Sequence, residues 1–372
     1  MGLSGAYLYL MMAPTIKVSF PSFLLIILSS FLSFLISNFF FLGIIIIDNC
    51  LRSCCFLYVK NVLSFYLVCS TRFKHAQNYI YSCLCCNMYN FNVLIIFNLV
   101  ELNILGWQFQ QTPPTIQCIL EKALTRATKL GRKDLHLVGA SRTDGGVHAW
   151  GQVAHFVTPF NYDSLDSIHA ALNGLLPPDI RVREISAVVP EFHARFSAKG
   201  KTYHYKIFND AVMDPFQRLY AYHVTHKLNA AVMREAANHF IGTHDFSAFV
   251  NSSRNDGVPN PVKTIFRFDI IKMGALLQLE VEGSGFMYRQ VRNMVALLLQ
   301  IGKEAIAPDI VPKILSTRDR KELAKYTLAA PPQGLCLVAV KYNEEHLQLP
   351  LGCPTTSLGR HHSISKCKVP FY

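Results

Sequence analysis

An arginine and an aspartate interrupt an apolar stretch in the segment HLVGASRTDGGVHAWGQVAHF, residues 136–156. Asp144 follows a run that is typical of a strand and precedes Gly145 and Gly146, whose backbones can adopt the positive φ of a sharp turn. A side chain on such a turn can face a cleft, where an ionised carboxylate can attack or stabilise an electron-poor carbon. Support of the turn alone is also a common role for aspartate before glycine.

The same segment allows a second hypothesis, in which Ser141, Asp144 and His148 form a hydrolase triad. A nucleophilic serine of the α/β-hydrolase kind lies on a G-x-S-x-G turn, and no such motif surrounds Ser141. The sequence therefore favours a role for Asp144 that does not depend on Ser141 as a nucleophile.

Hydrophobic periodicity predicts the elements that position this turn. Apolar residues recur at helical spacing over 116–130, and we expect Gly131 to end that helix as its C-terminal cap. Further elements are predicted at 134–140, 152–157, 201–208, 275–283 and 334–342 as strands, and at about 164–175, 229–241 and 286–302 as helices. Strands and helices mix without a strict β-α-β rhythm, which predicts the α+β class with an antiparallel sheet.

The first hundred residues differ from the rest in composition. Residues 18–47 contain no charged residue, and about 20 apolar residues suffice to span a bilayer. One hypothesis is a membrane span at about residues 20–47; the other is a mispredicted exon, because Phe, Ile, Asn, Tyr and Ser also dominate translated AT-rich noncoding sequence. Peptides from residues 20–50 in a membrane fraction would support the span.

Charge and cysteine content describe the remainder of the chain. Residues 101–372 carry a net charge of about +8, which suits a phosphate-rich partner. Their four cysteines are widely spaced, so we expect a reduced intracellular protein without a disulfide framework. The cluster Cys83, Cys85 and Cys86 lacks a second group of ligands at zinc-site spacing.

Five motifs occur in order: SRTDGGVHA, FHARFSAKGKTYHYKI, GTHDFSAF, GSGFMYRQVRNMVALL and GLCLVAVKY. Together, from about residue 106 to 342, they closely resemble the TruA family of tRNA pseudouridine synthases, particularly its eukaryotic members. The resemblance implies a mixed, mainly antiparallel sheet flanked by helices, with a central RNA-binding cleft. It also implies isomerisation of uridine to pseudouridine in tRNA, without a metal or an organic cofactor.

The resemblance carries the family's site residues onto this sequence. The catalytic aspartate falls on Asp144, and the arginine of the R-T-D run, Arg142, is expected to contact RNA or displace the target base. Tyr203 is expected to stack on the uracil and to assist proton transfer at C5, whereas Tyr205 suits the core. Arg292 is expected to pair with Asp144, and the remaining site residue is Leu335, which is expected to pack against the base. Further basic residues that could contact phosphates are Arg195, Lys199, Lys201, Arg254, Lys263 and Arg289.

Two departures from the family pattern concern the turn and the first strand. Gly145 stands where alanine is usual, and the run before Gly106 and Trp107 lacks the usual tyrosine and glycine. Residues 93–100 are the candidate for that strand. If they do not form it, the alternative function is that of an RNA-binding protein without activity. A membrane-anchored protein is a further alternative.

The predicted organisation has three parts: an apolar extension at 1–92 outside the fold, a catalytic region at 93–345, and a flexible tail at 346–372. The catalytic region is expected to form two α+β halves, about 93–200 and 201–345. We expect tRNA as the partner and leave open a homodimer, membrane association, and a mitochondrial or cytoplasmic location.

Overall fold

The computed structural model describes residues 91–100, 106–251 and 260–359. The apolar stretch 18–47, the cysteines at 83, 85 and 86, and Arg254 lie outside these residues. Within the described ranges, no helix has the length and apolar character needed to cross a membrane.

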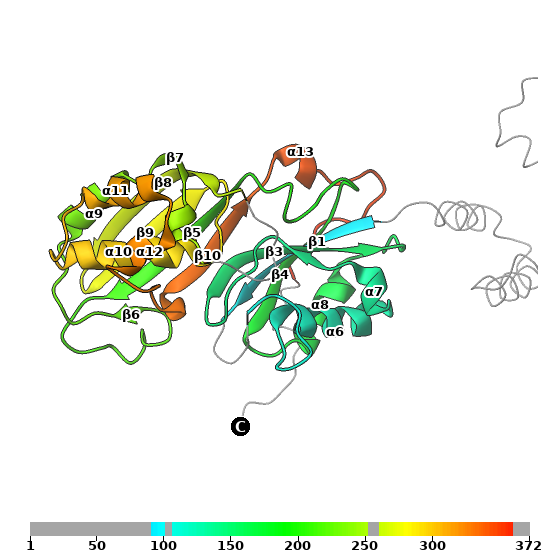
Figure 1. Cartoon of the computed structure of the whole chain (residues 1–372). Coiled ribbons are helices and arrows are strands. Elements are labelled where there is room, and N and C mark those ends of the chain that lie inside the picture. The colour runs from blue at the N-terminus through cyan, green and yellow to red at the C-terminus, as the bar shows by residue number, and fades with distance from the viewer. Residues whose placement is uncertain (1–90, 101–105, 252–259, 360–372) are drawn as a thin grey trace, which may run out of the picture. The chain divides into compact units, whose positions relative to one another are not determined.

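The described strands and helices follow one another in a mixed order along the chain (Figure 1). The strands are β1 (Phe91–Leu99), β2 (Val138–Gly139), β3 (His148–Thr158), β4 (Ile180–Val188), β5 (Gly200–Phe208), β6 (Tyr222–His223), β7 (Gly242–Asp245), β8 (Val262–Met273), β9 (Leu276–Gly283) and β10 (Leu335–Lys341). The helices are α6 (Ile116–Thr128), α7 (Arg132–Leu135), α8 (Asp166–Leu175), α9 (Ala230–Asn238), α10 (Gln290–Gly302), α11 (Ile310–Thr317), α12 (Arg320–Ala324) and α13 (Glu344–Leu347), with 3-10 turns η1 (Ser247–Phe249) and η2 (Pro332–Gly334).

The ten described strands form one sheet with the order β4-β1-β3-β10-β5-β9-β8-β7, in which β2 also pairs with β3 and β6 with β5. Neighbours are antiparallel except for β10 with β3 and β6 with β5, which are parallel. The predicted α+β class with a mainly antiparallel sheet is confirmed. The sheet is continuous because β10, the last of the described strands, hydrogen-bonds to β3 on one side and β5 on the other.

The first strand is present despite its unusual sequence. β1 pairs with β3 along one edge and with β4 along the other, so it lies inside the sheet. Its side chains are buried on both faces: Ile95 and Phe97 face the large core, and Leu94 faces a smaller cluster. The sheet therefore contains the first strand, for which residues 93–100 were the candidate.

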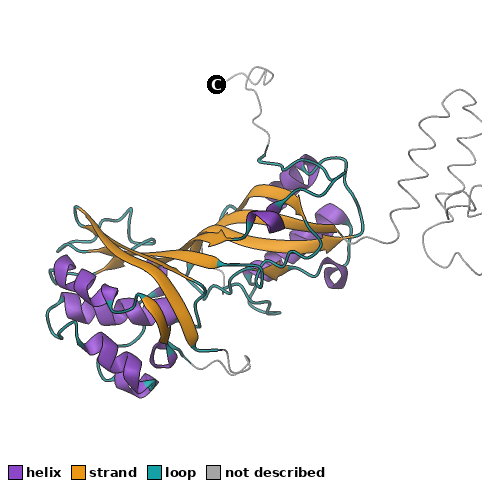
Figure 2. Ribbon diagram, turned by 90° about the horizontal axis from the view of Figure 1, so that it is seen from above, coloured by secondary structure: helices purple, strands orange, loops and turns teal. Residues whose placement is uncertain are grey.

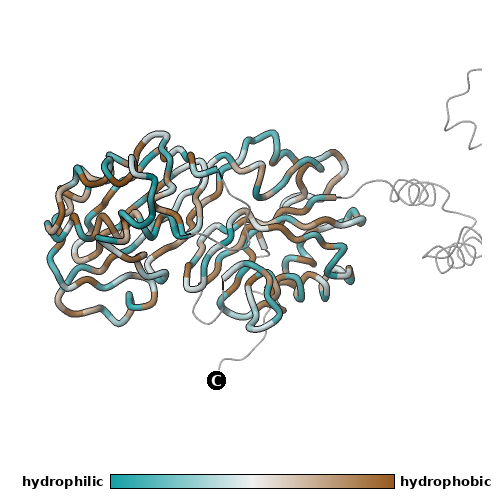
Figure 3. Tube along the Cα trace, viewed as in Figure 1, coloured by the Kyte–Doolittle hydropathy of each residue, from teal (hydrophilic) through white to brown (hydrophobic). Residues whose placement is uncertain are grey.

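One face of the sheet carries the main core. Helix α8 packs against β4, α7 against β3 and α9 against β8, while α6 packs on α8 and α10 on α9. Figure 2 shows helices α9 to α12 gathered on one side of the strands, and Figure 3 shows hydrophobic and hydrophilic residues alternating along the trace. The opposite face carries a smaller cluster that includes Ala140, Val153, Phe192 and Ala194.

The predicted elements differ from the structure at several boundaries: β3 begins at His148 and not at 152, α9 ends at Asn238 and not at 241, and three further differences follow from the backbone conformation. The left-handed residue that ends α6 is Lys129, at φ 63°, and not Gly131, which precedes α7. The strand predicted at 134–140 is wrong over its first part: residues up to Leu135 form a helical turn, and only Val138–Gly139 pair as a strand. The apolar alternation predicted a strand here because Leu135 and Leu137 are both buried. Leu135 belongs to the helical turn, however, and Leu137 to the extended chain after it.

The third difference is the start of α10, at Gln290 and not near 286, because Arg289 adopts a left-handed conformation with φ 59°. After β10, the chain to residue 359 makes specific contacts. Ser357 exchanges backbone hydrogen bonds with Ile185 of β4, and its hydroxyl donates to Asp166 at 2.7 Å. This part of the segment that we predicted as a flexible tail packs on β4 and α8.

Candidate active site around Asp144

Asp144 lies on the turn between β2 and β3. The Asp144 carbonyl accepts a hydrogen bond from the Val147 amide at 3.1 Å, which closes the turn. Gly146 has φ +81°, and a Cβ atom built there would lie 2.8 Å from Cγ of Pro332. The turn thus requires glycine at this position, for its backbone conformation and for its contact with η2.

Gly106 and Trp107 pack against the backbone of this turn. The Trp107 amide donates to the Thr143 carbonyl at 3.0 Å, and the Trp107 side chain is buried. Gly106 has φ +70°, and a Cβ atom there would lie 2.9 Å from the Thr143 carbonyl oxygen. The Gly-Trp pair of the sequence therefore packs directly against the backbone of the residue before Asp144.

Arg292 of α10 reaches the carboxylate of Asp144. Its Nη1 donates to Oδ2 of Asp144 at 3.0 Å, and its Nε donates to the Ala330 carbonyl at 2.7 Å. The side chains retain 10% exposure for Arg292 and 19% for Asp144. The expected pair is present, and the second hydrogen bond fixes the guanidinium so that the carboxylate has one orientation.

Tyr203 of β5 lies beside the same turn. Its hydroxyl donates to Oγ of Ser141 at 3.3 Å, and its ring meets Phe286 edge to face at 5.3 Å. Burial raises the pKa of Tyr203 to about 12, the Ser141 hydrogen bond opposes this shift, and the charge of Asp144 adds to it. The phenol consequently stays protonated at neutral pH.

The two remaining predicted residues differ in burial. Leu335 begins β10 opposite Tyr205 and is buried, so it lies in the sheet beside the tyrosines. Arg142 is exposed on the turn, two residues before Asp144. Tyr205 is fully buried and donates its hydroxyl to the Pro331 carbonyl at 2.8 Å, as suits a core residue. The structure thus brings Asp144, Tyr203 and Arg292 together. Leu335 is buried in the neighbouring strand β10, and Arg142 lies at the surface.

Two further side chains hold the strand that leads into the turn. Gln152 is fully buried and makes a two-way amide contact with the backbone of Ser141, accepting from its N–H and donating to its carbonyl. The ammonium of Lys201 donates to the Ala140 carbonyl at 2.7 Å. Burial lowers the pKa of Lys201 to about 8, and repulsion from Arg195 and Lys263 adds to this. Sequence reasoning grouped Lys201 with phosphate contacts and missed Gln152; a buried polar residue in an apolar strand was the available signal.

The hydrolase triad finds no support in the geometry. The hydroxyl of Ser141 accepts from Tyr203, whereas Nε2 of His148 lies 2.9 Å from the Leu219 carbonyl oxygen. Burial lowers the pKa of His148, which favours the neutral imidazole. His148 therefore connects the start of β3 to the loop that contains Leu219.

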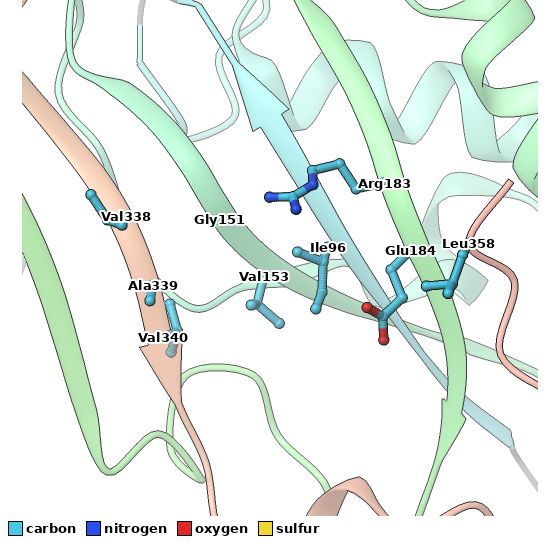
Figure 4. A pocket seen from close by; sticks show the side chains of 9 residues that line it. All are labelled: Ile96, Gly151, Val153, Arg183, Glu184, Val338, Ala339, Val340 and Leu358. Atoms are coloured by element: carbon cyan, nitrogen blue, oxygen red, sulfur yellow. The ribbon is translucent and has the colours of Figure 1, made fainter.

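A pocket of about 270 Å³ lies elsewhere, on the strands β1, β3 and β10 (Figure 4). Val153 and Val338 form part of its apolar lining, and Arg183, Glu184 and Leu358 form another part of it. Its lining includes none of the five predicted site residues. The pocket lining includes the charged side chains of Arg183 and Glu184 but no phenol, whereas a carboxylate, a guanidinium and a phenol meet at the turn of Asp144.

The described ranges contain no group of three or more His, Cys, Asp or Glu side chains that could hold a metal ion. The described cysteines Cys118, Cys336 and Cys353 are free thiols. Burial raises the pKa of Cys336 to about 11, which makes this thiol a poor nucleophile. The polar groups that converge at the turn are the carboxylate of Asp144, the guanidinium of Arg292 and the phenol of Tyr203.

Comparison with known proteins identifies the family to which this chain is similar. A family model described as tRNA pseudouridine synthase matches residues 106–197 and 236–343. The chain is 42% identical over 245 residues to tRNA pseudouridine synthase A 1 of Protochlamydia amoebophila, covering 66% of this chain and 93% of the relative. It is 41% identical to the tRNA pseudouridine synthase A of Acetivibrio thermocellus, over 68% of this chain and 99% of the relative.

The enzyme of that name from Bacillus subtilis is 41% identical over 64% of this chain and 94% of the relative. A crystal structure of a Cbf5-Nop10-Gar1 complex aligns with 55% of this chain and 54% of that chain at 10% identity, with a TM-score of 0.24 that is too low to indicate a shared fold. The family model spans the turn of Asp144 and the helix of Arg292, and on this match and those with the sequence relatives the chain belongs to the tRNA pseudouridine synthase family.

Proposed function

We infer that this chain isomerises uridine to pseudouridine in tRNA and that Asp144 is its catalytic residue. Family membership supports the reaction and the substrate class. The observation that supports the assignment of Asp144 is its partly exposed carboxylate, which Arg292 holds through Oδ2 at 3.0 Å beside the phenol of Tyr203. An isomerisation that breaks and remakes a bond at C1′ needs such a carboxylate near the sugar.

The chemistry follows from these three groups. The N1–C1′ bond breaks with its electron pair left on N1, the freed uracil turns, and C5 bonds to C1′, which breaks the Asp144–C1′ bond where Asp144 acted as the nucleophile. The proton at C5 then leaves and N1 takes up a proton, so that the product is an isomer of uridine. Arg292 occupies Oδ2, so we assign Oδ1 of Asp144 to the sugar, either as a nucleophile or to remove a sugar proton. Tyr203 stays protonated because of its raised pKa, so it can accept the C5 proton only while it passes its own proton on, with Ser141 as the neighbour in line.

In this proposal the tRNA lies over the turn of Asp144 in an RNA-binding cleft. Of the predicted basic residues, Lys201 contacts the segment before this turn, and the charges of Arg195 and Lys263 act on Lys201. The ammonium of Lys201 donates to the Ala140 carbonyl, so we expect its charge to act on the RNA at a distance and not through a direct phosphate contact. The target uridine must leave its stack to reach a side chain between two strands.

The purified full-length chain tests the function directly. We expect it to release tritium from unmodified tRNA transcripts labelled at uridine C5, and sequencing of the product to locate pseudouridine at defined positions. Mapping of tRNA from cells with and without the protein should show the same positions. Absence of tritium release, from a protein that still binds tRNA, would support the alternative of an RNA-binding protein without activity.

The variant Tyr203→Phe is expected to lower turnover by about 100-fold, because it removes the hydroxyl but keeps the flat ring. The affinity for tRNA should stay close to wild type for the same reason. Steady-state kinetics of tritium release and filter binding measure the two quantities separately.

The control for this variant is Tyr205→Phe. It also removes one buried hydroxyl, which donates to the Pro331 carbonyl, and costs about 1 kcal/mol of stability. Its turnover should remain near that of wild type. Equal turnover in the Tyr203 and Tyr205 variants would show that the Tyr203 hydroxyl takes no part in the reaction.

A further inference from the structure

Phe196 is an exposed aromatic side chain on a rigid turn. Its exposure is 78%, and one face of its ring is stacked on the imidazole of His193, with centroids 4.3 Å apart and 28° between the planes. The exposed surface therefore belongs to the other face and the edges of the ring. Single exposed apolar residues are common, so the inference depends on how this one is held and what surrounds it.

Backbone hydrogen bonds within the turn fix the position of the ring. Nδ1 of His193 accepts from the amides of Arg195 and Phe196, at 3.2 Å and 3.1 Å. The Ser197 hydroxyl accepts from the His193 amide at 3.0 Å, and the Ser197 amide donates to the His193 carbonyl at 2.9 Å. The neutral imidazole that this pattern requires agrees with the pKa of His193, which burial lowers.

The turn is also tied to the rest of the protein. The Ala194 amide donates to Nδ1 of His155 at 3.1 Å, and the Tyr342 hydroxyl donates to the Ala194 carbonyl at 2.7 Å. Ala194 and Phe192 are buried in the same cluster as Ala140. A ring on such a turn loses little conformational freedom when a ligand stacks on it.

The surroundings of the ring are cationic and are linked through Lys201 to the segment that leads to Asp144. The Arg195 guanidinium is 5.9 Å from the Phe196 ring centroid, and both Arg195 and Lys263 repel the ammonium of Lys201. Lys201 donates to the carbonyl of Ala140, which precedes Asp144 by four residues and hence by at most about 14 Å. An apolar ring among cations suits a ligand that combines flat bases with phosphates, and not an apolar protein surface.

We propose that Phe196 is a stacking platform for an unpaired tRNA base next to the target uridine, with Arg195 at the adjoining phosphate. The inference rests on the proposed function, since it places this base beside the nucleotide that enters the Asp144 site. Base stacking on an aromatic ring depends on a flat surface and not on base identity. Phe196 is accordingly a positioning residue, because a base stacked on its ring holds the neighbouring target uridine in line with the site.

The test compares Phe196→Ala, Phe196→Leu and Phe196→Trp in the full-length chain, with unmodified tRNA transcripts. The alanine and leucine variants should raise KM and the dissociation constant about tenfold, equivalent to ~1.4 kcal/mol and within the range for one stacked base, with kcat unchanged. The tryptophan variant should restore affinity. Its emission should also be quenched by tRNA beyond any change in wild type, whose tryptophans are Trp107 and Trp150.

Two controls separate stacking from other effects. Phe160→Ala removes another exposed phenylalanine, 48% exposed and two residues beyond the far end of β3, and should leave KM unchanged. Arg195→Ala should lower the slope of log affinity against log salt by about one, whereas Phe196→Ala should leave the slope unchanged.

Unchanged tRNA affinity in Phe196→Ala overturns the proposal. Wild-type affinity in Phe196→Leu also overturns it, because leucine fills space but cannot stack. If the wild-type chain converts no uridine, the proposed function fails, while the affinity and fluorescence measurements still decide whether Phe196 stacks on RNA.

Discussion

Replacing Asp144 with asparagine is expected to lower turnover by at least about a thousandfold, because the amide has nearly the same shape but can neither attack C1′ nor stabilise positive charge there. Binding of tRNA should persist, since the substitution removes a negative charge near the phosphates. Tritium release from C5-labelled tRNA measures the first effect, and filter binding measures the second.

The same variant leaves Arg292 without its counter-ion in a site where its side chain is 10% exposed. We expect a loss of up to about 3 kcal/mol of stability from the unpaired cation, so activity must be measured well below the unfolding temperature. Asp163→Asn, in the exposed loop after β3, is the matched control and should behave as wild type in every assay. Turnover by Asp144→Asn at the wild-type rate would remove Asp144 from the mechanism.

Arg292→Met and Arg292→Lys are expected to lower turnover by about 100-fold or more, with little change in tRNA affinity. The guanidinium holds the Ala330 carbonyl through Nε and the Asp144 carboxylate through Nη1. Lysine keeps the charge but has one nitrogen, so it cannot make both contacts in this geometry. A lysine variant that recovers most of the activity would show that charge matters more than orientation.

The double variant Asp144→Asn with Arg292→Met should be no slower than Asp144→Asn alone, because Arg292 acts through the carboxylate. The control is Arg234→Met on α9, which removes another arginine whose Nε donates to a carbonyl, that of Ile270 at 2.8 Å. A drop in tRNA affinity for Arg292→Met, with kcat intact, would instead indicate that Arg292 contacts a phosphate.

Sequence periodicity predicted the elements where one face of a helix or strand is buried. Helix α6 and strands β5 and β9 follow the expected pattern, since burial on one face leaves a period of 3.6 or 2 residues. Boundaries failed where the backbone adopts left-handed conformations at residues other than glycine, as at Lys129 and Arg289. Such conformations are set by local hydrogen bonds and packing, which residue type alone does not specify.

The site was predictable only in part, for a related reason. Family motifs assigned Asp144, Tyr203 and Arg292, although Asp144 and Arg292 are separated by 148 positions in the chain. The groups that hold them in place are mainly backbone carbonyls, such as those of Ala330 and Ala140, which every residue type carries. Their involvement depends on how irregular segments cross, and this becomes visible only in three dimensions.

The position of β10 has a consequence for the order in which the protein is made. Translation delivers β1, β3 and β4, and later β5, β8 and β9, before Leu335–Lys341, yet this last strand lies between β3 and β5. Its contacts with β3 span almost 190 residues, so it closes a long loop late in folding. A nascent chain that ends before residue 335 holds Asp144, Tyr203 and Arg292 without the strand that joins their two parts of the sheet, and we therefore expect tRNA modification to begin only after Leu335–Lys341 has been synthesised.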